Sequence, residues 1–180
     1  MSQSSFVLVP FPIDTEKPTD LSLTGTINRQ SSILTMSYCL QGQLAAISIS
    51  IPEPYPTRQH NLWQTTCFEF FLGIPSRDHY WEFNLSPAGH WNAYRFDGYR
   101  QGMQEELAFT TLPFQVELGT DRLSLVIALD LAAIVPVDHP LEVAITAVIQ
   151  TQTDVITYWA LTHPGTDADF HRRDSFVLAI

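Results

Sequence analysis

The residues best suited to chemistry lie between positions 62 and 100. Trp63 and Glu69 stand six residues apart in the run Leu-Trp-Gln-Thr-Thr-Cys-Phe-Glu-Phe-Phe-Leu. Because side chains of a β-strand alternate between its two faces, a strand that begins near Trp63 puts the indole and the carboxylate on one surface. Phe68, Phe70 and Leu72 then face the core.

Two segments further along add polar side chains to the same region. In the run 80–86, Glu82 and Asn84 lie opposite the apolar residues, and Arg95 belongs to the aromatic run 90–96. If these strands are neighbours, one sheet face gathers acids, amides, an arginine and aromatic rings. Such a mixture suits polyhydroxylated ligands, because rings stack on sugar C–H groups and planar polar side chains bond hydroxyls. The alternative is an ordinary solvated face of an antiparallel sheet.

The elements that must position these residues are strands. Period-two alternation of apolar side chains is common along the chain, whereas helical periodicity is nearly absent. A parallel sheet is excluded because no segment is long enough for crossover helices. One helical turn is expected at 130–134, capped by Asp130 and ended by Pro136. We therefore predict an all-β fold, a jelly-roll-like sandwich of antiparallel sheets with at most one or two short helical turns. The predicted strands are 5–9, 20–28, 32–40, 47–51, 66–73, 80–86, 90–96, 107–117, 122–130, 141–150, 154–160 and 174–179.

Composition limits the functional classes. With 180 residues and 45% hydrophobic side chains, the chain is expected to form one domain, 1–180. A net charge of −10 argues against nucleic acid and against membrane surfaces. Cys39 and Cys67 are expected to be free thiols, with one disulfide as the alternative. The first residues do not resemble a secretory signal and no apolar run reaches the roughly 20 residues of a membrane helix, so a cytoplasmic location is expected.

Three segments carry a resemblance to a known family. The run Trp63 to Leu72, the segment Tyr80 to Gly89 and the ending Asp169 to Ile180 resemble DOMON-like domains and, more broadly, family 9 carbohydrate-binding modules. The shared pattern is a tryptophan, an acid six residues later within an apolar strand, and a following aromatic strand that ends in Pro-x-Gly. The similarity extends from about residue 5 to residue 180.

The resemblance implies a groove on one concave sheet, in which two tryptophans enclose a sugar ring. Trp63 matches the first tryptophan, and Trp159 is the candidate for the second. Glu69 matches the acid that bonds sugar hydroxyls, and Arg95 is a looser match to the basic partner. The acidic pair that usually follows the first tryptophan is replaced here by residues 64–66, Gln-Thr-Thr.

No cofactor is expected, although two alternatives remain open. Asp167 and Asp169, in the irregular stretch 161–173, are candidate oxygen ligands for calcium, but aspartates in such loops commonly cap backbone groups. His171 is expected to hold this loop against the sheet through a hydrogen bond. Some DOMON relatives bind haem through a methionine and a histidine, and Met36 and Met103 are the internal methionines here.

We conclude from the sequence that the chain is a stand-alone ligand-binding domain for a carbohydrate or a sugar-like metabolite, and that it is not an enzyme. Nucleophile-elbow, phosphate-loop and zinc-protease motifs are absent from the sequence. Alternatives are a protein–protein interaction module, a haem protein, and a glycosidase that would use Glu69 with Glu82. The predicted ligand-binding residues are Trp63, Glu69, Glu82, Asn84, Arg95 and Trp159.

Overall fold

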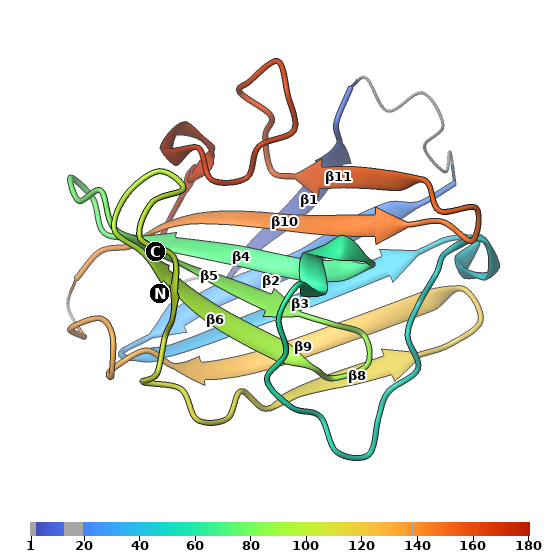
Figure 1. The fold of residues 1–180 in the computed structure, drawn as a ribbon, viewed down its shortest axis with the longest axis horizontal. Helices are drawn as coiled ribbons and strands as arrows, with labels where there is room; N and C mark the ends of the chain where they lie inside the picture. Colours follow the sequence, from blue (N-terminus) through green and yellow to red (C-terminus); the bar gives the residue numbers. More distant parts are fainter. Residues whose placement is uncertain (1–2, 13–19, 138) are drawn as a thin grey trace.

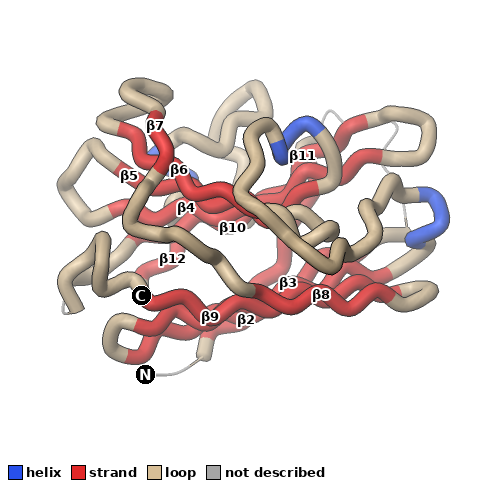
Figure 2. The backbone as a smooth tube through the Cα atoms, turned by 60° about the horizontal axis from the view of Figure 1, so that its bottom comes forward, coloured by secondary structure: helices blue, strands red, loops and turns tan. Residues whose placement is uncertain are grey.

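The computed structural model describes residues 3–12, 20–137 and 139–180, which form two layers of antiparallel strands (Figures 1 and 2). Sheet A has the spatial order β1 (Ser4–Pro10), β2 (Ser22–Gln30), β3 (Ile33–Gln41), β9 (Arg122–Asp130) and β8 (Phe114–Leu118). Sheet B has the order β7 (Gln104–Glu105), β6 (Trp91–Phe96), β5 (Tyr80–Leu85), β4 (Cys67–Gly73), β10 (Glu142–Gln150) and β11 (Ile156–Ala160), and β12 (Leu178–Ala179) pairs with β10.

The two sheets are joined along one edge by β1. This strand pairs with β2 over Ser4–Leu8 and with β11 through Val9 and Pro10. The predicted all-β antiparallel sandwich is therefore confirmed, and the main core lies between its layers.

Alternation explains which side chains enter this core. On β4, Phe68, Phe70 and Leu72 face sheet A, as predicted. Phe70 stacks on Phe83 of β5 with ring centroids 4.5 Å apart. The hydroxyl of Tyr38 on β3 crosses the core and donates a 2.6 Å hydrogen bond to the carbonyl oxygen of Glu69, which ties the two sheets together.

A second, smaller cluster lies on the other face of sheet B, so β4 and β5 are buried on both sides. This outer cluster is formed by Phe71, Tyr80, Tyr94, Phe96, Ala144 and Phe176, with Trp63 and Phe170 packed against it. The interpretation of this face as an ordinary solvated surface is therefore wrong.

Some predicted elements differ from the structure. The segment 47–51 is not a strand, because only Ile47 pairs, through one bridge to Thr151. The predicted strand 107–117 forms only from Phe114, directly after Pro113, which cannot donate a ladder hydrogen bond. The ending 174–179 is divided between the 3-10 turn η3 (Arg173–Ser175) and β12.

The helical content is limited to single turns in the described ranges. Besides η3 these are η1 (Leu44–Ala46) and η2 (Leu62–Gln64), so the structure has three 3-10 turns where one or two short turns were expected. The expected turn after Asp130 is present, and the Asp130 carboxylate accepts a 3.0 Å hydrogen bond from the Ala132 N–H. No described helix has the length and apolar character required to cross a membrane. Cys67 is buried and Cys39 half-buried, and both are free thiols.

Candidate ligand-binding pocket

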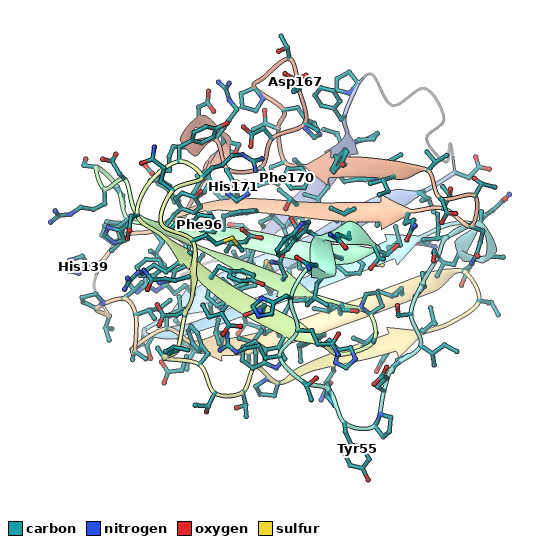
Figure 3. The ribbon with its side chains drawn as sticks, in the orientation of Figure 1. Tyr55, Phe96, His139, Asp167, Phe170 and His171 are labelled. Carbon is teal, nitrogen blue, oxygen red and sulfur yellow. The ribbon has the colours of Figure 1, made fainter. Side chains whose placement is uncertain are left out.

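A cavity of about 670 Å³ opens on the face of sheet B that is turned away from the main core. Strands β4 and β5 form its floor, and the loop 161–172 forms one wall. Figure 3 shows Phe96, Phe170 and His171 close together where the end of β6 meets this loop, with Asp167 further out. The aromatic lining residues are Phe11, Trp63, Phe71, Phe96, Tyr158 and Phe170, and the polar ones are Glu69, Glu82, Arg100, Thr166, Asp167 and His171.

Two carboxyl groups lie at the floor of the cavity. Glu69 pairs across the ladder with Asn84, and Phe71 pairs with Glu82, so the two glutamates are diagonal neighbours on adjacent strands. Their side chains share one face because each strand alternates. Only 2% of Glu69 and 5% of Glu82 are exposed.

The carboxyl groups of the two glutamates differ in their hydrogen bonding. Asn84 donates a 2.8 Å hydrogen bond from Nδ2 to Oε1 of Glu82. Thr146 on β10 donates a 3.3 Å hydrogen bond to Oε2 of Glu69. Oε1 of Glu69 is buried and has no hydrogen-bond partner among the described residues. A buried polar oxygen without a partner is costly, so a ligand group that forms a hydrogen bond with it would be favoured.

Burial also changes the protonation of this pair. Removal from water raises the pKa of Glu82 to about 7, and the hydrogen bond from Asn84 and the charge of Arg100 only partly oppose the rise. Burial, followed by the nearby Glu82, raises the pKa of Glu69 well above its usual range. Near neutral pH the floor therefore retains at least one proton and can both donate and accept hydrogen bonds.

The loop wall is fixed to the sheet by a network around Asp169. The carboxylate of Asp169 accepts hydrogen bonds from the Tyr99 hydroxyl at 2.5 Å, from the Arg100 guanidinium at 2.8 Å and from the His171 N–H at 3.1 Å. Nδ1 of His171 lies 2.8 Å from the Tyr80 hydroxyl, and its Nε2 lies 3.8 Å from Oε2 of Glu82. His171 therefore holds the loop against the sheet, as predicted from the sequence.

The rings of the outer cluster support the cavity from below. Tyr80 and Phe96 stack with centroids 4.9 Å apart, and Trp63 meets the ring of Tyr94 edge-on at 5.8 Å. Trp63 belongs to η2, and β4 begins only at Cys67. The indole and Glu69 thus line the same cavity, as expected, but a 3-10 turn rather than strand parity places the indole there.

Three of the six predicted ligand-binding residues line the cavity, namely Trp63, Glu69 and Glu82. Asn84 is fully buried behind this surface, where it orients Glu82. It supports the floor but does not itself line the cavity.

Trp159 and Arg95 lie elsewhere, and their expected placement in the groove is corrected. Trp159 is 3% exposed and packs in the main core, because on β11 the alternate residue, Tyr158, faces the cavity. Arg95 shares its face of β6 with Trp91 and Ala93, both of the main core, so it points away from the outer cluster. The basic side chain in the cavity is Arg100, from the β6–β7 connection.

Sequence reasoning missed several lining residues, above all Arg100, Tyr158 and Phe170. Because side chains alternate along β11, Tyr158 and Trp159 lie on opposite faces of the sheet, and only one of them can face the ligand. For Arg100 and Phe170 no local signal exists, because loops that are distant in sequence bring them to the cavity.

The candidate metal and haem ligands have other partners. Asp169 is occupied by Tyr99, Arg100 and the His171 backbone, and no group of three or more metal-ligating side chains is found in the parts of the chain that the structure describes. Met36 is in the main core, while Met103 lines the cavity. Both ring nitrogens of His171 face protein groups, so ligation of a haem iron by Met103 with His171 would break the contact that holds the loop. This pair therefore does not fit a haem.

Comparison with known proteins identifies the fold. No protein-family model and no curated protein matches the chain. A solved structure of a proposed carbohydrate-binding protein from Bacteroides uniformis is similar over 98% of this chain and 84% of its own, with a TM-score of 0.65 and 14% sequence identity. A family 9 carbohydrate-binding module from Caldicellulosiruptor kristjanssonii, in complex with glucose, is similar over 91% of this chain and 77% of its own, with a TM-score of 0.51 and 12% identity. The chain therefore has the fold of a carbohydrate-binding module.

Proposed function

We propose that this protein is a non-catalytic domain that binds a carbohydrate in the cavity on sheet B. The observation that carries the proposal is the meeting of aromatic rings and two buried carboxyl groups in one cavity of about 670 Å³. This volume lies within the range of roughly 300–1,000 Å³ that small-ligand sites occupy. The two structural neighbours support the proposal, since one is a proposed carbohydrate-binding protein and the other is a family 9 carbohydrate-binding module in complex with glucose.

The roles of the side chains follow from their placement. Trp63 and Tyr158 offer ring surfaces to the cavity from the η2 turn and from β11. Sugar C–H faces pack on such rings, while the hydroxyls need polar partners. Glu69 and Glu82 at the floor and Arg100 at the wall provide these partners.

A small ligand suits this site better than a protein partner does. Oε1 of Glu69, which lacks a partner, and Glu82, whose pKa is raised to about 7, are at the floor, where both side chains are almost completely buried. A flat protein surface does not reach such a depth, whereas a sugar ring can enter and replace water there.

Titration calorimetry with monosaccharides and disaccharides tests the proposal, with Trp63→Ala and Arg95→Gln measured in parallel. We expect at least one sugar to bind the parent protein. Trp63→Ala should weaken that binding about tenfold, because stacking on an aromatic ring contributes roughly 1 kcal/mol or more. Arg95→Gln, on the opposite face of the sheet, should leave the affinity unchanged. Equal affinities of the parent and Trp63→Ala for the bound sugar would contradict the placement of the ligand beside this indole.

A further inference from the structure

The acidic groups of the cavity outnumber its basic ones. Glu69, Glu82 and Asp167 line it together with one cation, Arg100. Arg100 is already paired, because its guanidinium lies 2.8 Å from Asp169. Among the described residues, the nearest basic group to the remaining acids is Nε2 of His171, 3.8 Å from Glu82, and this imidazole is neutral near pH 7 because its pKa is lowered to about 4.

The unpartnered oxygen of Glu69 is the second observation. Oε1 of Glu69 is buried in a residue that is 2% exposed, it lines the cavity and it lacks a hydrogen-bond donor among the described residues. Burial favours the protonated form of Glu69, but a cationic ligand displaces this proton, and the carboxylate oxygen then accepts a hydrogen bond that is stronger when the donor is charged. The missing partner is therefore a donor that the ligand supplies.

The aromatic lining favours a positive charge over a neutral group at this place. Trp63, Phe71, Phe96 and Tyr158 surround the floor. The faces of aromatic rings attract cations, and rings combined with carboxylates are a common environment for ammonium groups.

From the unpartnered oxygen of Glu69, the neighbouring Glu82 and the surrounding rings, we propose that the carbohydrate bound here is an amino sugar whose ammonium group lies against these two glutamates. This inference rests on the proposed function and specifies its ligand class. The ammonium would donate to Oε1 of Glu69 and pair with the carboxylate of Glu82, while the ring of the sugar packs on the aromatic lining.

Binding of an ammonium should be linked to pH. The groups that face Glu82 are Glu69 on β4, Tyr80 and Asn84 on β5, Tyr94 on β6, Arg100 in the β6–β7 connection and His171 in the C-terminal loop. Burial and Arg100 lower the pKa of His171 to about 4, so this imidazole stays neutral near pH 6. With the pKa of Glu82 raised to about 7, an ammonium at the floor displaces a proton from the glutamate pair.

Calorimetric titration with D-glucosamine, N-acetyl-D-glucosamine and D-glucose at pH 5, 6 and 7 tests the inference. We expect glucosamine to bind at least about tenfold more tightly than the two neutral sugars at pH 7, because a hydrogen bond to a charged group is the stronger one. Its affinity should increase from pH 5 to pH 7, whereas the affinities for the neutral sugars stay nearly constant. Measurements in buffers of different ionisation enthalpy should show proton release upon glucosamine binding.

Glu82→Gln provides the decisive variant, because its amide keeps the shape and can still accept the hydrogen bond from Asn84. It should remove most of the pH dependence and the preference for glucosamine, and circular dichroism with urea unfolding shows whether the variant is folded. Equal binding of glucose and glucosamine by the parent would overturn the amino-sugar inference and leave the proposed function standing. Failure of all sugars to bind would overturn both.

Discussion

Nδ1 of His171 lies 2.8 Å from the hydroxyl oxygen of Tyr80, and this contact fastens the C-terminal loop to the floor of the cavity. The same hydroxyl accepts a 3.3 Å hydrogen bond from the Arg100 N–H. One tyrosine on β5 thus positions both the loop wall and the β6–β7 connection. The cavity depends on this junction, since Arg100 and His171 both line it.

Removal of this hydroxyl should loosen the wall without unfolding the domain. We expect Tyr80→Phe to destabilise the protein by about 1–3 kcal/mol, because His171 and the Arg100 N–H lose a buried partner. Hydrogen–deuterium exchange should become faster in residues 166–171 and at 99–101. Tyr55→Phe is the matched control, since Tyr55 is 83% exposed. Unchanged exchange in both segments would show that other contacts hold the wall.

The buried Glu82 should give the stability of the protein a measurable pH dependence. Its folded pKa is raised to about 7 from an ordinary value of 4.5, so the folded state binds the proton more tightly than the unfolded chain does. The contribution is fully present below pH 4.5 and is lost as the pH increases through about 7. Relative to the parent, Glu82→Gln should therefore gain stability over this interval, by up to roughly 3 kcal/mol at 1.36 kcal/mol per pKa unit.

Urea unfolding at pH 4.5, 6 and 8 measures this difference. His171 contributes the opposite slope, because its folded pKa is lowered to about 4 and its stabilisation is lost as the pH falls from 6.5. Comparison of the parent with Glu82→Gln at each pH separates the two effects. Glu117→Gln on the exposed strand β8 is the control and should show the same profile as the parent. If Glu82→Gln also ran parallel to the parent, the pKa of Glu82 would be the same in the folded and unfolded states.

Local sequence patterns predicted the sandwich because the alternation of apolar and polar residues along a strand indicates which side chains are buried. This period places Phe68, Phe70 and Leu72 in the main core. It also places Glu69 and Phe71 together on the opposite face of β4. Alternation also predicted β9 and β10 nearly to the residue. The isolated segment 47–51 has the same pattern but lacks a neighbouring strand to pair with, and pairing is a property of the tertiary structure.

The candidate site was only partly predictable, for a physical reason. Its floor lies on strands that are neighbours in sequence, so Glu69 and Glu82 could be found by parity. Its wall depends on contacts between residues 69 to 91 positions apart, such as Tyr99 with Asp169. The attachment of the loop by His171 was expected, but sequence patterns do not identify the partners in such contacts.

The two arginines of the β6 region should behave differently. Arg100 lines the cavity and pairs with Asp169, whereas Arg95 lies on the opposite face of β6. We expect Arg100→Gln to weaken sugar binding and to accelerate hydrogen exchange in residues 166–171, with a loss of stability below about 1 kcal/mol because its side chain is 53% exposed. Arg95→Gln should change neither quantity. A loss of sugar affinity confined to Arg95→Gln would restore the assignment made from the sequence.

The adjacent aromatic residues of β11 offer the sharpest test of which face of sheet B binds the ligand. Tyr158 is 36% exposed and lines the cavity, whereas Trp159 is 3% exposed and opposite Ala147 in the main core. Trp159→Ala should cost about 3–5 kcal/mol, the usual loss when a large core side chain is truncated. Tyr158→Ala should cost less than about 1 kcal/mol and weaken sugar binding about tenfold.

Urea unfolding and calorimetry on the two variants separate stability from binding. Trp159→Phe, which retains a large apolar ring, should be folded at 25 °C and should bind sugar like the parent, because its side chain remains on the core side of the sheet. The opposite pattern would be an unchanged sugar affinity of Tyr158→Ala and a reduced sugar affinity of folded Trp159→Phe. This result would mean that the ligand enters between the sheets. That outcome would require the main core to open, since Ala147 and Trp159 are sealed there.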